Sequence, residues 1–317
     1  MTNNLRLGFF GDGPWSHEAL RVITSDKTIE ICFVCLRSVN PDQVLKQMAH
    51  NLSIPIIENA HINDPTFIER VSSLNVDLLV SMSFDQIIKN PLLSLPTLGF
   101  INCHAGALPF YRGRNVINWA LINGETRFGI TVHYIDSGID TGDIICQDWV
   151  DILPEDDYPS CLTKAYKACP KTLYKAIKQL QKGNAERIVQ DSIHPVGTYF
   201  PRRVPGDETI DWMWPSLRIH NFVRALTTPG PLARTHVNQQ TLGVKKTKLI
   251  KDAPSYIATP GEIIGHATEG VVVKTGDSSL MILEVDWVDN ESHQKNRPWR
   301  PTFKIGTRFS KCEGHSK

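Results

Sequence analysis

Asn102, Cys103 and His104 stand side by side directly after the apolar run 98–101, and all three are side chains that can do chemistry. A Cys and a His can form a nucleophilic pair, but the thiol then needs a lowered pKa and a base beside it. Successive side chains of a strand point to opposite faces, so an extended 99–104 puts Asn102 and His104 together and Cys103 on the other face. The spacing therefore favours an amide that stabilises an oxyanion and an imidazole that moves a proton, with Cys103 packed under the sheet.

Two loops follow that could complete such a site. The stretch 105–114, AGALPFYRGR, is shaped by glycine and proline, and its Arg112 and Arg114 can meet anionic groups of a ligand. The stretch 136–143, DSGIDTGD, holds three Asp and two Gly residues between two β-like segments. It reads either as a plain hairpin turn or as a loop that supports His104 with an Asp and binds a heterocycle with its backbone.

The turn GDGPWS at 11–16 is close to a dinucleotide-binding fingerprint, but Pro14 removes a backbone donor and Ser16 replaces the third glycine. We therefore expect a tight strand-to-helix turn beside a different ligand, with Asp12 or Trp15 bordering it. Cys32 and Cys35 form C-x-x-C inside an apolar run, which indicates core residues, and we expect no metal site.

Strand and helix patterns alternate through the first half of the chain. Strands are predicted at 5–11, 29–36, 76–83, 99–104, 128–136 and 143–152. Helices are predicted at 14–23, 41–52, 64–74, 84–95, 115–125 and 163–183, the last interrupted by Pro170. This alternation predicts an α/β, Rossmann-like fold with a mostly parallel sheet and helices on both faces.

The composition of the sequence changes after about residue 190, where Pro and Gly become frequent. A helix at 214–226 precedes five short β-like runs, which predict a small β-rich domain of open-barrel, OB-like type. We expect a catalytic domain at 1–190, a linker at 191–211 and the β-rich domain at 212–317.

The bulk composition fits a globular protein without a special partner. The net charge is +1 over 317 residues, so nothing in it demands a nucleic acid. Seven irregularly spaced cysteines argue against a disulfide framework, and the first residues have neither a signal-peptide nor a transmembrane pattern. We expect a cytoplasmic protein that does not bind membranes.

Together these motifs carry a family resemblance. Asn102-x-His104, LPFYRG at 108–113, NGE at 123–125, FGITVHYID and DSGIDTGDI resemble the N10-formyltetrahydrofolate-dependent formyltransferases. The stretch YFPRRVPGDETIDW, followed by a helix and a β-rich tail, is similar to the two-domain members.

The resemblance implies a site without metal, in which a substrate amine attacks the formyl group of N10-formyltetrahydrofolate. Asn102 would stabilise the oxyanion, His104 would take the proton of the amine, and Asp140 would hold His104. The folate-contacting positions of the family fall on Arg114 and on the loop residues Asp136, Ser137, Gly138, Ile139 and Asp140.

The acceptor is less closely defined. Members that act on initiator tRNA typically carry a basic insert after the second strand, whereas 35–52 here has only Arg37 and Lys46 as basic residues. HAGALPFYRGRNVINWALINGET and PRRVPGDETIDW resemble the formyltransferase domain that acts on UDP-4-amino-4-deoxy-L-arabinose. This implies a nucleotide-linked amino sugar as acceptor, formylated for lipopolysaccharide O-antigens or related glycans, in a homodimer that pairs through the C-terminal domain.

Two alternatives stay open: a methionyl-tRNA formyltransferase, for which KKTK at 245–248 offers positive charge, and a binding protein without chemistry. Residues that could bind the sugar nucleotide are, besides Asp12 and Trp15, the side chains of Tyr111, Arg112 and Arg203.

Overall fold

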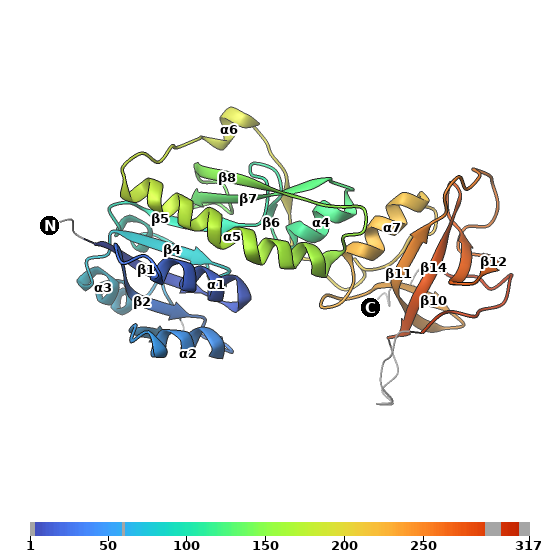
Figure 1. Cartoon of the computed structure of the whole chain (residues 1–317), viewed down its shortest axis with the longest axis horizontal. Helices are drawn as coiled ribbons and strands as arrows, with labels where there is room; N and C mark the ends of the chain where they lie inside the picture. The colour runs from blue at the N-terminus through green and yellow to red at the C-terminus, as the bar shows by residue number, and fades with distance from the viewer. Residues whose placement is uncertain (1–3, 59–60, 289–298, 311–317) are drawn as a thin grey trace. The chain divides into compact units, whose positions relative to one another are not determined.

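The computed structural model describes residues 4–58, 61–288 and 299–310 (Figure 1). The chain divides into two compact units. The first comprises Met1–Val116, Arg127–Asp151 and Thr163–Phe200, and the second comprises Ile117–Thr126, Ile152–Leu162 and Pro201–Lys317. Within the described ranges, no helix combines the length and the hydropathy that crossing a bilayer requires.

The first unit is built on a seven-stranded sheet in the order β3-β2-β1-β4-β5-β7-β8. Its strands are β1 (Leu5–Gly11), β2 (Ile29–Leu36), β3 (Ile56–Glu58), β4 (Leu78–Met82), β5 (Phe100–His104), β7 (Arg127–Tyr134) and β8 (Ile144–Asp151). The first five strands are parallel, and β7 and β8 run antiparallel to their neighbours. A further pair, β6 (Arg112–Gly113) and β9 (Tyr199–Phe200), forms a small parallel ladder.

The helices of the chain's first two hundred residues are α1 (Gly13–Thr24), α2 (Gln43–Asn51), α3 (Pro65–Ser73), α4 (Val116–Ile122), α5 (Tyr158–Gln181) and α6 (Gln190–Ile193), with a short 3₁₀ turn η1 (Leu92–Ser94). Their starts follow local chemistry. Asp42 caps α2 by accepting from the Leu45 N–H, and Pro65 occupies the first position of α3, where its missing N–H costs nothing.

Helices cover both faces of this sheet, because alternate strand side chains are apolar on each side. On one face, Phe10 of β1 packs edge-on against Phe33 of β2 and Phe67 of α3. On the other face, the Cys103 thiol of β5 packs against the backbone of α5 at Cys169. The predicted α/β fold with a mostly parallel sheet is confirmed.

Two predictions about helices are wrong. The stretch 84–95 forms only the short turn η1. Pro91 lacks an N–H and restricts Asn90, and Asn63 captures the Lys89 N–H and the Ile87 carbonyl that a helix would use. Conversely, α5 continues through Pro170 without interruption.

The second unit contains α7 (Ser216–Ala225) and a five-stranded antiparallel sheet in the order β10-β11-β14-β13-β12. Its strands are β10 (Ala233–Val237), β11 (Gln240–Leu249), β12 (Ile263–Ala267), β13 (Gly270–Lys274) and β14 (Ser279–Trp287). They enclose an apolar cluster in which Trp212 stacks on Phe309 and donates its indole N–H to Thr235. The predicted small β-rich domain is confirmed, while the functional boundaries at 190 and 211 stay predictions.

Candidate active site

Strand β5 presents the two side chains that the sequence singled out. Asn102 and His104 lie on the same face as the buried Phe100, and His104 is only 9% exposed. Cys103 points to the opposite face, where its Sγ lies 3.6 Å from the Cys169 carbonyl oxygen. The contact with Cys169 and burial raise the pKa of the Cys103 thiol well above its ordinary value. Cys103 is therefore a packed residue, as predicted, and not an activated nucleophile.

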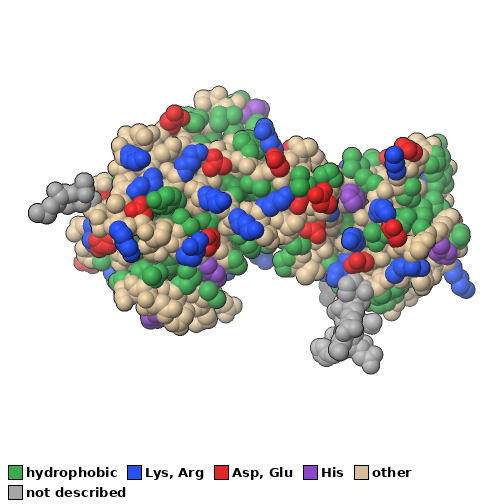
Figure 2. Space-filling model, in the orientation of Figure 1, with side chains coloured by type: hydrophobic (Ala, Val, Ile, Leu, Met, Phe, Trp, Pro, Cys, Tyr) green, Lys and Arg blue, Asp and Glu red, His purple; other side chains and the backbone are tan. Residues whose placement is uncertain are grey.

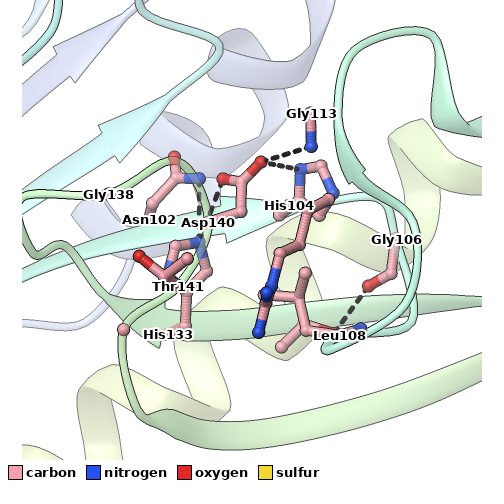
Figure 3. Close-up of polar contacts among 12 residues, drawn as sticks. Asn102, His104, Gly106, Leu108, Gly113, His133, Gly138, Asp140 and Thr141 are labelled. Carbon is pink, nitrogen blue, oxygen red and sulfur yellow. Dashed lines mark hydrogen bonds and ion pairs between the residues drawn. The ribbon is translucent and has the colours of Figure 1, made fainter. Parts of the chain in front are cut away.

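The two ring nitrogens of His104 have different partners. Nε2 lies 2.7 Å from the backbone carbonyl oxygen of Tyr111. Because a carbonyl only accepts, Nε2 must carry a proton, and in the neutral ring the lone pair is on Nδ1. Nδ1 faces the Asp140 carboxylate, with Oδ2 at 3.7 Å (Figure 3). His104 thus has one basic nitrogen, and that nitrogen lies beside an acid.

His133 is a member of this cluster that sequence reasoning missed. It lies directly opposite Asn102 in the antiparallel pairing of β5 with β7 and is 2% exposed. Its Nδ1 donates to the Tyr134 carbonyl at 2.8 Å. Its Nε2 lies 3.2 Å from Asn102 Nδ2 and 3.4 Å from Asp140 Oδ1. His133 therefore joins the amide of Asn102 to the carboxylate of Asp140.

Asp140 is the common partner of both imidazoles. Burial by itself would raise the pKa of this carboxyl, but the charges of His104 and His133, the His133 hydrogen bond and the Gly113 N–H outweigh it. The Gly113 N–H donates to Asp140 Oδ2 at 2.9 Å. The net result holds the pKa of Asp140 well below its ordinary range, so the group is a carboxylate at neutral pH. The cluster can accept a proton at His104 Nδ1 and stabilise the resulting cation.

The backbone around the cluster leaves no room for extra side-chain atoms. A Cβ at Gly106 would lie 2.4 Å from the Tyr111 carbonyl oxygen and 2.5 Å from His104 Nε2. In the acidic loop, Asp136 accepts from the Gly138 N–H and from the Thr141 hydroxyl, which closes a compact turn. Asp140 itself has a positive φ of 56°, which is uncommon for a residue with a side chain.

Of the other residues proposed from sequence, three lie in or directly next to β6. Tyr111 stacks its ring on Phe200 and supplies the carbonyl to His104. The Arg112 guanidinium donates to the side chain of Gln190. Arg114 is exposed, as are the loop residues Asp136, Ser137, Gly138 and Ile139.

The remaining three belong to other segments of the chain. Asp12 forms an ion pair with Arg37 at 2.8 Å, and burial raises the pKa of Asp12 although Arg37 opposes the shift. The Trp15 ring packs edge-on against Tyr166. Arg203 falls in the second compact unit, where burial lowers its pKa and Tyr158 opposes the shift.

Comparison with known proteins places these observations in a family. Residues 12–177 match the formyl transferase family, and residues 204–295 match the formyl transferase C-terminal domain. The chain is 34% identical to the methionyl-tRNA formyltransferase of Clostridioides difficile over 241 residues, which is 76% of either chain. It is 32% identical to the methionyl-tRNA formyltransferase of Ruminiclostridium cellulolyticum over 263 residues, which is 83% of either chain.

Solved structures share the fold. A sugar 3N-formyl transferase, crystallised with dTDP and 5-N-formyl-THF, matches with a TM-score of 0.66 and 20% identity over 90% of this chain and 98% of that one. An N-formyltransferase from Helicobacter canadensis, in complex with folinic acid and dTDP-3-aminofucose, matches with a TM-score of 0.65 and 21% identity over 88% of this chain and 99% of that one. With the family matches to both halves, this confirms the resemblance found in the sequence: the chain belongs to the formyl transferase family.

Proposed function

We propose that the protein transfers the formyl group of N10-formyltetrahydrofolate to the amine of a nucleotide-linked amino sugar. The observation that carries the proposal is the convergence of Asn102, His104 and Asp140 at the carboxyl end of β5, with the carboxylate held ionised beside the basic nitrogen of His104. Acyl transfer to an amine needs a base for the amine proton and a donor for the carbonyl oxygen, and this cluster offers both.

In this proposal His104 Nδ1 accepts the proton of the amine as the new C–N bond forms, and returns it to N10 of the leaving tetrahydrofolate as the formyl C–N10 bond breaks. Nε2 keeps its own proton and donates it in a hydrogen bond to the Tyr111 carbonyl, which keeps the ring in the required tautomer. Asp140 stabilises the resulting imidazolium without taking the proton, because its own pKa is lowered. Asn102 Nδ2 lies 3.2 Å from His133 Nε2 and offers an N–H to the carbonyl oxygen of the formyl group.

The residues around the cluster suit a folate donor, which supplies the activated formyl carbon when it is bound. Ile139, at the tip of the acidic loop, is 48% exposed and gives an apolar surface for a flat heterocycle. The backbone of 136–140 offers hydrogen-bonding groups to the heterocycle, and the exposed Arg114 offers a cation to the carboxylates of a folate tail.

The sugar nucleotide is preferred over tRNA because the basic residues after β2 are already paired. Arg37 is engaged by Asp12 and by Asp85, and Lys46 is engaged by Glu58. On the face shown in Figure 2, Lys and Arg side chains are interspersed with Asp and Glu. A polyanion such as tRNA is bound through a concentrated positive surface, whereas a diphosphate needs only a few cations.

Methionyl-tRNA formylation is the second candidate function. It is supported by the similarity to methionyl-tRNA formyltransferases, at 34% identity over 76% of the chain. The two candidates share the chemistry at His104 and differ only in the acceptor.

The same proposal includes the product, the cellular compartment, the oligomeric state and the nucleotide contacts of the enzyme. The product would be a formamido sugar for lipopolysaccharide O-antigens or related glycans, made in the cytoplasm, where the free cysteines of the chain stay reduced. A homodimer that pairs through the C-terminal domain and the nucleotide contacts of Asp12, Trp15, Tyr111, Arg112 and Arg203 also remain proposals.

The test is an acceptor panel. The protein is incubated with N10-formyltetrahydrofolate and either dTDP-, UDP- or GDP-linked amino sugars or charged initiator tRNA, and the formylated product is measured. Formylation of a sugar nucleotide is the expected result. Product from the tRNA alone would replace the first candidate with the second, and no product from any amine would contradict both.

A further inference from the structure

The segment 187–190 runs along the loop that carries Asp140. Ile188 exchanges two backbone hydrogen bonds with Ile144, at 2.8 and 2.9 Å. Arg187 forms an ion pair with Asp143 at 3.2 Å, and its guanidinium lies 4.1 Å from the centre of the Tyr134 ring. This segment therefore holds the C-terminal side of the acidic loop.

Gln190 adds a contact to the loop itself. Its side chain is 2% exposed, and its Nε2 donates to the carbonyl oxygens of Asp140 and Gly142, both at 2.8 Å. These bonds fix the Asp140–Thr141 and Gly142–Asp143 peptide groups, directly after the strained backbone of Asp140. A residue with a positive φ persists only where its surroundings hold it, and Gln190 is such a support.

Arg112 fixes Gln190 in turn. The Oε1 atom of Gln190 accepts from Arg112 Nε at 3.0 Å and from Arg112 Nη2 at 2.8 Å. With Oε1 occupied by two cationic donors, the amide of Gln190 can only present its NH₂ group to the loop. Arg112 directly follows Tyr111, whose carbonyl accepts from His104 Nε2.

The segment 111–114 is also bonded to β9 and to Thr198 directly before it. Arg112 and Arg114 donate their backbone N–H groups to Thr198 and Phe200, at 3.0 and 2.8 Å. The Tyr111 N–H donates to the Thr198 hydroxyl at 2.9 Å. The backbone 111–114, which includes β6 (Figure 1) and supplies the Tyr111 carbonyl and the Gly113 N–H, is therefore held by β9 and, through the Arg112 side chain, by Gln190.

We propose that Gln190, held by Arg112, is a positioning residue that fixes the Asp140 carboxylate and the Tyr111 carbonyl on the two sides of His104. The side chain bonds to Arg112 and to the loop carbonyls, and it acts through the loop. The consequence for turnover rests on the proposed formyl transfer, whereas the effect on the loop does not.

The test is Gln190→Glu in the full chain. The carboxylate keeps an acceptor for Arg112 but places an oxygen against the two loop carbonyls, so the loop is released. Backbone amides of 138–143 should exchange with solvent roughly tenfold faster or more, since local opening becomes easier. Misplacing a catalytic group by about 1 Å costs about a hundredfold, so we expect kcat to fall roughly ten- to a hundredfold with KM values nearly unchanged.

Two further variants separate a positioning role of Gln190 from a nonspecific disturbance of the fold. Ser192→Ala, in the same short helix, removes only an exposed bond to the Val189 carbonyl and should leave exchange and kcat as in the wild type. Arg112→Met keeps the NH₂ group of Gln190 but removes the guanidinium that orients its amide. The backbone amides of 138–143 should again exchange faster than in the wild type, but by less than in Gln190→Glu. Arg112→Met serves as the test if Gln190→Glu does not fold.

Unchanged exchange of 138–143 in the folded Gln190→Glu variant, or in Arg112→Met where only that variant folds, would overturn the inference. A kcat of Gln190→Glu equal to that of Ser192→Ala would do the same. If the wild type transfers no formyl group at all, the proposed function fails, and the exchange measurement still decides the role of Gln190.

Discussion

In the first unit, Asp140 is buried between two imidazoles and a backbone N–H, and its pKa is lowered. In the second unit, His220 is half-buried with the Thr247 hydroxyl 2.9 Å from its Nδ1, and burial, with Arg224 adding to it, lowers its pKa to about 4. Lys274, also in the second unit, has its pKa lowered by burial although Asp277 opposes the shift. Partners outweigh burial at Asp140 of the first unit, whereas burial outweighs the partners at His220 and Lys274 of the second unit.

This difference distinguishes a site from a core. Desolvation acts in both places, and only opposing charges and directed hydrogen bonds can overcome it. Asp140 has them because β5, β7 and the segment 112–113 all contribute a partner. At Lys274 of the second unit, burial outweighs the partners that are present, the Thr275 carbonyl and Asp277, and its pKa is lowered.

The largest effect is expected at His104. His104→Asn removes the base but keeps a side chain that can donate to the Tyr111 carbonyl. General base catalysis contributes about 10²–10⁴-fold, so formyl transfer should fall by that factor. Turnover is measured as release of tetrahydrofolate, with the thermal midpoint as a check on folding. Turnover equal to the wild type would show that another group is the base.

A smaller loss is expected when the site is crowded. Gly106→Ala brings a Cβ against the Tyr111 carbonyl and His104 Nε2, at 2.4 and 2.5 Å. Overpacking of this kind costs about 1–3 kcal/mol, and displacing His104 should lower kcat roughly ten- to a hundredfold. Gly265→Ala is the matched control, because its nearest neighbour in the second unit, Val272 Cβ, is 3.9 Å away. Equal kcat in the two variants would mean that the tight packing at Gly106 does not serve the site.

The pH dependence of stability should separate the two units. A histidine with a folded pKa of about 4 and an ordinary value of 6.5 binds its proton more readily in the unfolded chain. Its contribution to stability is therefore full above pH 6.5 and is lost as the pH falls toward about 4. His220→Gln should show a smaller drop in thermal midpoint than the wild type over this range. An equal drop would place the acid sensitivity elsewhere.

The smallest effect on activity is expected at Cys103. Cys103→Ala should leave turnover unchanged and reduce stability by about 1 kcal/mol through the small cavity. Cys146→Ala is the matched control, because its thiol also packs on a backbone carbonyl of α5, that of Thr172, at 3.6 Å. Inactivation by Cys103→Ala but not by Cys146→Ala would show that the Cys103 thiol takes part in the reaction.

The sequence could predict what depends on local pattern. Strand parity was enough to separate Cys103 from Asn102 and His104, and alternation was enough for the fold class. His133 could not be found this way, because its place opposite Asn102 depends on β7 running antiparallel to β5. Gln190 lies 50 residues beyond Asp140, and no local signal links the two. The false helix at 84–95 failed because Asn63, far away in sequence, takes its backbone bonds.

The titration of the Asp140 carboxyl carbon by NMR tests the central claim most directly, because it asks whether partners or desolvation govern this group. We predict that Asp140 stays ionised through the mildly acidic range and protonates well below its ordinary value of 3.8. A midpoint at or above 3.8 would mean that burial prevails, and that the cluster at β5 is a core and not a site.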